Sequence, residues 1–309
     1  MKIVFMGTPQ AAVPTLERIL ADGHEVCAVW TQPDKPAGRG NKLHAPPIKE
    51  FALRMGLPVF QPTKIKTPES LELFRSHQAD IVVVVAYGRI LPQTFLESFP
   101  KGAINVHFSL LPKYRGAAPV NWVIVNGEPK TGVTTMQMDA GLDTGDILLV
   151  SETEIGADET AMQLMERLSL TGADLLSETL AKLDELPRIK QDDSKATFAP
   201  IMKKEDGLID WNLTATEINN RIRGFQPFPK SFTFHVGKRV VMWKAKVVEN
   251  SDIIFPNGAV TEAKGDKLWI ACGKNTVLQI LEAQTEGKNK MTVRDFLNGA
   301  KMQIGDKLG

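Results

Sequence analysis

Apolar residues in the first third of the chain alternate between short unbroken runs and runs spaced for one face of a helix. A run over 3–6 is followed by helical spacing over 11–21 and by a second run over 25–30, which predicts a strand, a helix and a strand. A longer unbroken run over 81–86 fits a strand covered on both faces of a parallel sheet. We therefore expect an open, mostly parallel, Rossmann-like α/β sheet, with its ligand cleft at the carboxyl ends of the strands.

The pattern also predicts the later elements. The expected strands and helices of the N-terminal part are strands over 59–60, 103–106, 131–138 and 147–154, and helices over 46–55, 68–77 and 158–186. The last helix is expected to open on an acidic turn. From residue 231 onward, short β-rich stretches recur at about ten-residue spacing with glycine-containing turns, which predicts a small antiparallel barrel.

These changes of pattern predict a two-domain protein. The expected parts are an N-terminal domain over 1–188, a linker over 189–205 that overlaps a polar stretch at 187–200, and a C-terminal domain over 206–309. With 43% hydrophobic and 24% charged residues, the chain is globular rather than disordered. No apolar run is long enough for a signal peptide or a membrane span, so we expect a cytoplasmic protein.

Charge is unevenly distributed along the chain. The net charge is only +1, but residues 200–309 carry 17 basic and 12 acidic side chains. Such an excess fits either a solvated basic face or a surface for a polyanion. The two cysteines, Cys27 and Cys272, are far apart in the sequence and predict neither a disulfide framework nor a thiolate metal site.

The most concentrated chemistry lies in the segments 105–112 and 139–146. Asn105 and His107 alternate onto one face of a strand that ends at the expected cleft, so an amide and an imidazole project together. The second segment holds three acids and two glycines in eight residues. A carboxylate beside the imidazole would complete a group able to stabilise an oxyanion and move a proton during acyl transfer to an amine. Spacing alone leaves open which acid does so: Asp139, Asp143 or Asp146.

Other motifs predict no metal and no dinucleotide. Gly7 follows the first strand but lacks the further glycines of Gly-x-Gly-x-x-Gly, so it indicates a tight turn. The acidic segment departs from the EF-hand pattern, and the five histidines lack metal-ligand spacing.

A proline- and glycine-rich loop over 32–43 follows the second strand and carries Lys35, Arg39 and Lys42. It has no apolar periodicity with which to bury itself. We expect it to overhang the cleft, either as a solvated loop or as a basic lid that orders on a polyanion.

Taken together, these residues resemble the methionyl-tRNA formyltransferase family of the folate-dependent formyltransferase superfamily. The pair formed by Asn-x-His at 105–107 and Asp-x-Gly-x-Asp-Thr-Gly at 139–145 is typical of the superfamily. The motifs Arg-Gly-Ala-Ala-Pro at 115–119 and Pro-Ala-Gly-Arg at 36–39 are typical of the tRNA enzyme. Further matching segments are 7–9, 31–39, 83–88, 109–112, 132–134, 210–211 and 222–225.

The resemblance implies transfer of a formyl group from 10-formyltetrahydrofolate to the α-amino group of methionyl-initiator tRNA, with no metal. It implies that Asn105, His107 and Asp143 are catalytic. The folate contacts it implies are Tyr87, Gly88, Ile90, Leu91, Ser109, Leu110, Leu111, Pro112 and Asp139.

For the tRNA, the resemblance implies contacts from Lys35, Arg39 and Lys42 and from a basic surface of an OB-like C-terminal barrel. It also implies a monomer that acts away from membranes. Phe108 departs from the family, in which a smaller residue is common, and this leaves the shape of the pocket open.

Two rival functions remain. A formyltransferase for an amino-sugar nucleotide would share the catalytic residues but would need neither the basic loop nor a basic barrel. A non-catalytic RNA-binding module would have no need of an intact Asn105, His107 and Asp143.

Overall fold

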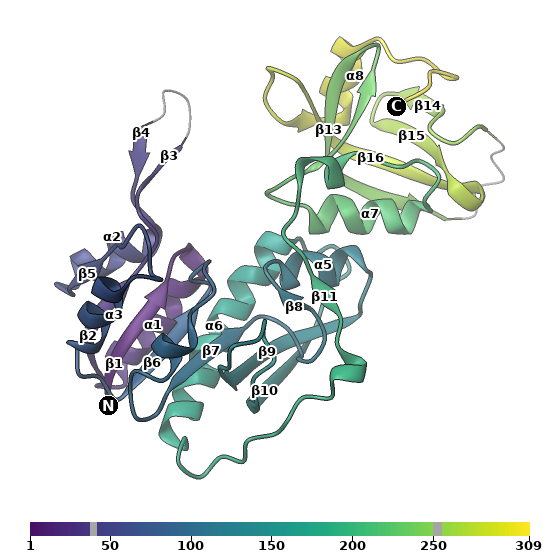
Figure 1. Cartoon of the computed structure of the whole chain (residues 1–309). Helices are drawn as coiled ribbons and strands as arrows, with labels where there is room; N and C mark the ends of the chain where they lie inside the picture. Colours follow the sequence, from purple (N-terminus) through teal and green to yellow (C-terminus); the bar gives the residue numbers. More distant parts are fainter. Residues whose placement is uncertain (38–41, 250–254) are drawn as a thin grey trace. The chain divides into compact units, whose positions relative to one another are not determined.

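The protein, seen in a computed structural model that describes residues 1–37, 42–249 and 255–309, divides into two compact units (Figure 1). The first unit comprises residues 1–119, 130–154 and 165–200. The second comprises residues 120–129, 155–164 and 201–309. Among the described residues, no helix is long and apolar enough to cross a membrane.

The first unit contains a seven-stranded sheet in the order β10-β9-β7-β6-β1-β2-β5. Its strands are β1 (Lys2–Gly7), β2 (Glu25–Trp30), β5 (Val59–Phe60), β6 (Ile81–Val85), β7 (Ala103–His107), β9 (Lys130–Gln137) and β10 (Ile147–Glu154). Short pairs are formed by β3 (Lys35–Ala37) with β4 (Lys42–His44), and by β8 (Arg115–Gly116) with β11 (Phe198–Ala199). The helices of this unit include α1 (Val13–Ala21), α2 (Pro47–Arg54), α3 (Pro68–Arg75), α4 (Gln93–Leu96) and most of α6 (Ala161–Ala181), whereas nearly all of α5 (Pro119–Val125) belongs to the second unit.

Strands β5, β2, β1, β6 and β7 run parallel, while β9 pairs antiparallel with both of its neighbours, β7 and β10. The chain moves from β1 outward to β2 and β5, then crosses back to β6 on the other side of β1. This reversal places a topological switch point between β1 and β6, where open α/β sheets bind ligands. The expected Rossmann-like sheet is confirmed, and β7 lies directly beside the switch.

Alternate residues of β7 face opposite sides of the sheet. Ala103 packs in a core with Phe74 of α3 and Phe95 of α4, and Asn105 and His107 share its face because side chains alternate along a strand. Val106 and Phe108 face the other side, where they approach Gly172 of α6. Phe108 therefore lies on the side of the sheet opposite to Asn105 and His107.

Gly172 makes room for Val106 and Phe108 beneath helix α6. A Cβ at Gly172 would lie 2.9 Å from Val106 Cγ1 and 3.3 Å from Phe108 Cε1. We expect Gly172→Ala to lower the free energy of unfolding by about 1 to 3 kcal/mol through overpacking, measured by urea denaturation.

Gly299, in helix α8 (Val293–Ala300), is the matched control for this substitution. A Cβ there meets nothing within 4 Å, so Gly299→Ala should stabilise by roughly 0.5 kcal/mol. The Gly172→Ala penalty should shrink in a Val106→Ala background, because the clashing methyl is gone. Equal effects at both glycines would contradict close packing at Gly172.

An aromatic cluster beneath the sheet contains a histidine held in its neutral form. Trp30 Nε1 donates to His77 Nε2 at 3.0 Å, which requires that nitrogen to be unprotonated. Burial, followed by the charge of Lys2, lowers the pKa of His77.

In the unfolded chain, His77 takes up a proton below pH ~6.5. In the folded protein, protonation of His77 is disfavoured. The contribution of neutral His77 to the free energy of unfolding is therefore complete above that pH and falls as the pH decreases. We expect His77→Gln, which retains an acceptor but does not titrate, to flatten the fall in unfolding free energy between pH 7 and 5. Burial also lowers the pKa of His24, so some slope will remain. An unchanged slope would contradict this role for His77.

The helix expected over 158–186 is shorter in the structure, and the prediction of an acidic first turn is wrong. Helix α6 begins at Ala161 and has no acidic residue in its first turn. Glu159 lies before it and accepts a hydrogen bond from Gly156 N at 3.0 Å. The acidic residues therefore form the turn that precedes the helix rather than its first turn.

The polar stretch over 187–200 folds onto the first unit. Ile189 bridges to Ile147 of β10, and β11 pairs with β8. Thr197 Oγ1 accepts from Tyr114 N at 2.9 Å.

The second unit is built on six antiparallel strands. Five follow the order β12-β13-β16-β15-β14, and β17 pairs with β16. The elements are β12 (Ser231–His235), β13 (Lys238–Val248), β14 (Val260–Lys264), β15 (Lys267–Cys272), β16 (Thr276–Thr285), β17 (Met291–Thr292), α7 (Ala215–Gly224) and α8 (Val293–Ala300). Their apolar faces enclose a separate core with α7 and α8, and Trp122 of α5 packs edge-on against Phe225 in the same unit.

Candidate active site

Strand β7 presents Asn105 and His107 at its carboxyl end. The two residues are only 8% and 6% exposed. Within the described part of the chain, the Asn105 side-chain amide has no hydrogen-bond partner, and its two N–H groups remain available to a substrate.

The imidazole of His107 is oriented by its neighbours. Nε2 lies 3.0 Å from the Tyr114 carbonyl oxygen, and since a carbonyl only accepts, Nε2 carries the proton of this hydrogen bond. The other nitrogen, Nδ1, lies 3.7 Å from Asp143 Oδ2. Nδ1 is therefore the nitrogen left to meet a reacting group.

Asp143 is the acid that the fold places beside His107. Its backbone is left-handed, with φ 54°, and Oδ2 also accepts from Gly116 N at 2.8 Å. Asp139, by contrast, accepts from Gly141 N at 3.0 Å and from the Thr144 hydroxyl at 2.6 Å, and so shapes the loop. Gly145 sits so close to β9 that a Cβ would lie 1.8 Å from Gln137 O.

The turn after His107 is held by internal hydrogen bonds. The fully buried Ser109 hydroxyl donates to Lys113 O at 2.7 Å. Thr134 of β9 donates to Ser109 O at 2.7 Å and accepts from Leu111 N at 3.2 Å. The Ser109 side chain therefore shapes the turn, and of residues 109–112 only Leu110 and Pro112 are partly exposed.

The loop after β6 is tied to β1 and β2 across the switch point. The Tyr87 carbonyl accepts from the Thr8 hydroxyl at 2.9 Å and from Gln32 Nε2 at 3.1 Å. The Tyr87 ring is buried in the core, and burial raises the pKa of its hydroxyl to about 12. Tyr87 thus anchors the loop, whereas Ile90 is 66% exposed.

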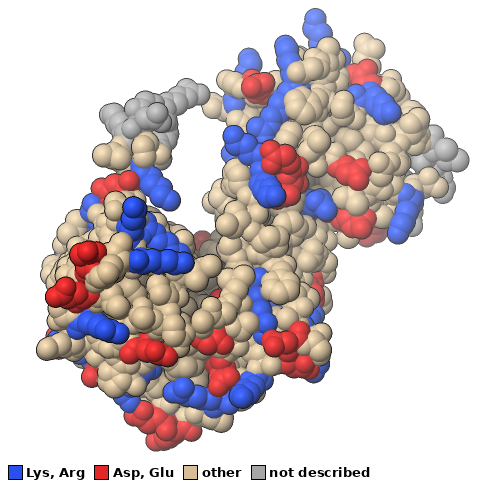
Figure 2. Space-filling view, viewed as in Figure 1, with Lys and Arg blue, Asp and Glu red and all other residues tan. Residues whose placement is uncertain are grey.

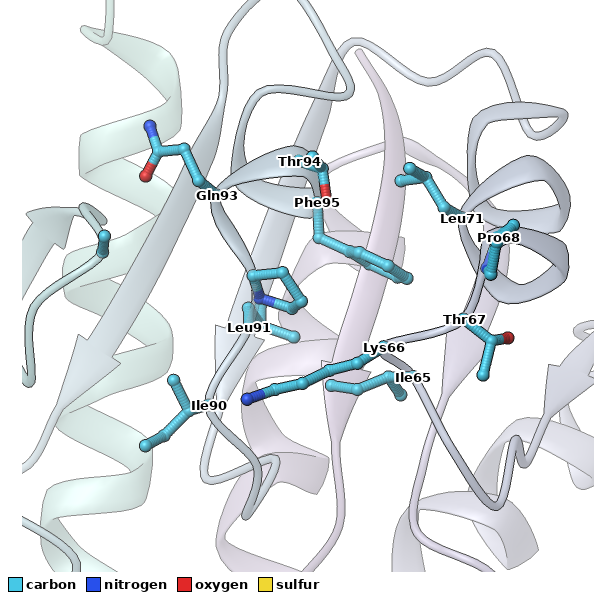
Figure 3. A pocket seen from close by; sticks show the side chains of 12 residues that line it. Ile65, Lys66, Thr67, Pro68, Leu71, Ile90, Leu91, Gln93, Thr94 and Phe95 are labelled. Carbon is cyan, nitrogen blue, oxygen red and sulfur yellow. The ribbon is translucent and has the colours of Figure 1, made fainter.

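An open hollow of about 520 Å³ adjoins this loop. Ile90, Leu91 and Phe95 line one side, the Ile65–Leu71 segment lines another, and Ala140 of the acidic loop completes it. Figure 3 shows the Lys66 side chain extending across the hollow toward Ile90. Its size suits a small-molecule site, and its apolar walls suit a flat ring system.

Gln32, Thr134 and Tyr114 support the site but were not singled out from the sequence. Gln32 also accepts from Arg89 Nε at 3.1 Å, so it joins β2 to the loop that follows β6. The only sequence signal for Gln32 is its place as a polar residue shortly after a strand, and Thr134, inside β9, offers no such signal. For Tyr114 we find no such signal, because it acts through its backbone.

The basic loop forms a short hairpin at its base, with β3 paired to β4. Lys35 is exposed, Lys42 lies in β4, and Arg39 falls outside the described residues. The hairpin is anchored by Asp34, which bonds Lys49 Nζ at 2.8 Å and accepts from Gln61 Nε2 at 2.7 Å. The hydrogen bonds from Lys49 and Gln61 lower the pKa of Asp34.

In the parts of the chain that the structure describes, no cluster of His, Cys, Asp and Glu is arranged to hold a metal ion.

Comparison with known proteins places this geometry in a family. Residues 1–180 match the family model described as formyl transferase, and residues 201–301 match the formyl transferase C-terminal domain. A methionyl-tRNA formyltransferase of Solibacter usitatus is 50% identical over 312 residues, covering 100% of this chain and 99% of the relative. One from Caldanaerobacter subterraneus subsp. tengcongensis is 50% identical over 308 residues, covering 99% of each chain.

Among solved structures, an N-formyltransferase from Helicobacter canadensis in complex with folinic acid and dTDP-3-aminofucose has the same fold. It aligns with a TM-score of 0.67 and 21% identity, over 91% of this chain and 98% of its own. The family models and the full-length relatives together establish that this chain belongs to the formyl transferase family, among the methionyl-tRNA formyltransferases.

Proposed function

We propose that this chain transfers the formyl group of 10-formyltetrahydrofolate to the α-amino group of methionyl-initiator tRNA. The observation that carries the proposal is the convergence of Asn105, His107 Nδ1 and Asp143 at the end of β7. These groups can contact the acceptor amine, stabilise an oxyanion and transfer a proton. The full-length relatives named for this reaction support the choice of substrates.

The reaction begins with attack by a neutral amine. An α-amine has an ordinary pKa of about 7.7 to 8.0, so a substantial fraction is neutral at physiological pH. Its nitrogen bonds to the formyl carbon, and the carbonyl oxygen gains negative charge. Asn105 donates an N–H to this oxyanion, and protonated His107 donates from Nδ1.

Collapse of the intermediate breaks the bond between the formyl carbon and folate nitrogen N10. The amine gives up one proton and N10 gains one, so no net proton is consumed. Asp143 attracts a positively charged imidazole across 3.7 Å. The proton passes from the amine nitrogen to N10 directly, through water, or through His107 and Asp143.

The folate occupies the hollow beside Ile90, Leu91 and Ala140 in this proposal. The remaining implied contacts, Gly88, the 109–112 turn and Asp139, border the same strand ends. The apolar lining excludes water from one face of the ring system, while nearby backbone groups supply polar contacts.

The tRNA is proposed to meet the basic hairpin and the C-terminal unit. Figure 2 shows a row of Lys and Arg side chains along one edge of that unit. Lys230 and Lys290 lie 4.4 and 5.7 Å from the centre of the Trp243 ring, and cations beside aromatic rings are typical of nucleic-acid surfaces.

In this proposal residues 1–188 carry the catalytic side chains and the basic hairpin, and residues 206–309 add a second surface for tRNA. Residues 189–205 join these parts, and their first portion, up to residue 200, also belongs to the first unit. We further propose that the protein acts in the cytoplasm, because its tRNA substrate is used there by the ribosome. We also propose that it acts as a monomer, as the family resemblance implies.

The decisive experiment offers three acceptors to the purified protein with labelled 10-formyltetrahydrofolate. We expect formylation of initiator methionyl-tRNA and none of elongator methionyl-tRNA or of a dTDP-amino sugar. Transfer to the amino sugar alone would favour the rival sugar enzyme. Absence of transfer to any acceptor would favour a non-catalytic RNA-binding protein.

A further inference from the structure

Gln191, in the stretch whose composition suggests a linker, is hydrogen bonded to the acidic loop of the site. Its Nε2 lies 2.8 Å from Asp143 O and 2.7 Å from Gly145 O. Its Oε1 accepts from Arg115 Nε at 3.1 Å and from Arg115 Nη2 at 2.7 Å. Both donors and both acceptor positions of the amide are therefore used.

The surrounding groups allow only one orientation of this amide. A guanidinium only donates and backbone carbonyls only accept, so exchange of the amide oxygen and nitrogen would leave all four contacts repulsive. Arg115 is itself held in place. It is 3% exposed, its Nη2 also bonds Asp193 Oδ1 at 2.8 Å, and its strand pairs with β11.

The position of the Asp143 carboxylate depends on the backbone that Gln191 binds. Asp143 has a left-handed backbone, which costs free energy for a residue other than glycine. Two hydrogen bonds from one rigid amide, on either side of Thr144, oppose relaxation of the loop. Relaxation would move Oδ2 away from Gly116 N and His107 Nδ1.

The same stretch also fixes the other partner of the imidazole. Thr197 Oγ1 accepts from Tyr114 N at 2.9 Å, and the Tyr114 carbonyl accepts from His107 Nε2 at 3.0 Å. Gln191 and Thr197 of this stretch thus support both sides of His107.

We infer that Gln191 is a positioning residue for formyl transfer, holding the Asp143 loop so that its carboxylate faces His107, with Arg115 orienting the Gln191 amide. The inference rests on the proposed function of Asp143. It assigns a role in catalysis to a side chain outside the sequence motifs of the active site.

Gln191→Glu is the sharpest test, because it keeps the size of the side chain and the pairing with Arg115. It replaces the donating NH₂ with an oxygen that faces two carbonyl oxygens. We expect kcat for formyl transfer to fall by up to about 100-fold, as for a small misplacement of a reacting group. The KM for tRNA should be unchanged.

The control is Ser194→Ala, which removes an exposed 2.6 Å hydrogen bond to Asp192 Oδ1 in the same segment. We expect wild-type kcat from it. Thermal melting is recorded for every variant. Gln191→Ala, which removes the donors without adding charge, replaces Gln191→Glu if the latter does not fold.

A double-mutant cycle with Asp143→Ala separates positioning from general stabilisation. If Gln191 acts through Asp143, Gln191→Glu should lower kcat far less in the Asp143→Ala background than in the wild type. Equal losses in both backgrounds, wild-type kcat for Gln191→Glu, or loss of the fold in both Gln191 variants would overturn the inference. Wild-type activity of Asp143→Ala would instead overturn the proposed function of the site, and the inference with it.

Discussion

Replacing His107 with alanine should lower kcat for formylation of initiator methionyl-tRNA about 100- to 1,000-fold, the range for loss of one oxyanion donor. Nδ1 is the one ring nitrogen not engaged with Tyr114, and no other imidazole lies in the motif. KM for both substrates should change little, because the donor acts mainly on the transition state. Steady-state kinetics with labelled folate measure both parameters.

The matched control is His235→Ala in the C-terminal unit. His235 bonds Asp306 Oδ2 at 3.0 Å, so its loss removes a His–Asp pair that belongs to the second unit and not to the proposed catalytic group. We expect unchanged kcat. A His107→Ala enzyme that turns over at the wild-type rate while remaining folded would remove His107 from the mechanism.

Asp143→Asn should lower kcat by about 100-fold while leaving the folded state intact, in the range for general acid–base groups. Asparagine can still accept from Gly116 N, which Oδ2 does at 2.8 Å in the native chain. The charge opposite Nδ1 is lost, however. A larger loss for Asp143→Ala than for Asp143→Asn would measure what the hydrogen bond to Gly116 adds.

The neighbouring acids provide controls for Asp143. Asp146 binds Gln137 N through its backbone oxygen at 2.9 Å, so Asp146→Asn should retain nearly full kcat. Asp139→Asn should have an intermediate effect, since its carboxylate shapes the loop through Gly141 and Thr144. Equal losses at all three positions would argue for a general charge effect rather than a specific role of Asp143.

Much of the fold could be predicted because the signal was local. Unbroken apolar runs become the central strands β1, β6 and β7, and helical spacing becomes α1 with an offset of two residues at its start. The predicted start of α6 is wrong because acidic residues suit a preceding turn equally well, and Glu159 accepts a hydrogen bond from Gly156 N in that turn. The hairpin of β3 and β4 carries no apolar alternation, so the sequence predicts only a loop there.

The site was predictable as far as its residues act through side chains in recognisable motifs. Asn105 and His107 sit where strand alternation placed them. Tyr114 acts through a carbonyl and Gln191 through contacts with distant backbone, and neither kind of contact leaves a pattern in the chain. Phe108, whose effect on the pocket was open, packs on the far side of β7 against Gly172.

The parallel sheet, the pairing of an amide with an imidazole at one strand end, and the resemblance to formyltransferases all follow from the order of residues alone, because each depends on short local patterns in the chain. Three features depend on the tertiary structure. Asp143 lies beside the imidazole, His107 Nδ1 is the ring nitrogen left for substrate, and the 187–200 stretch supports the site. These features depend on contacts such as Asp143 with Gly116 and Gln191 with Arg115. These contacts join residues that are 27 and 76 positions apart in the chain, so no local pattern predicts them.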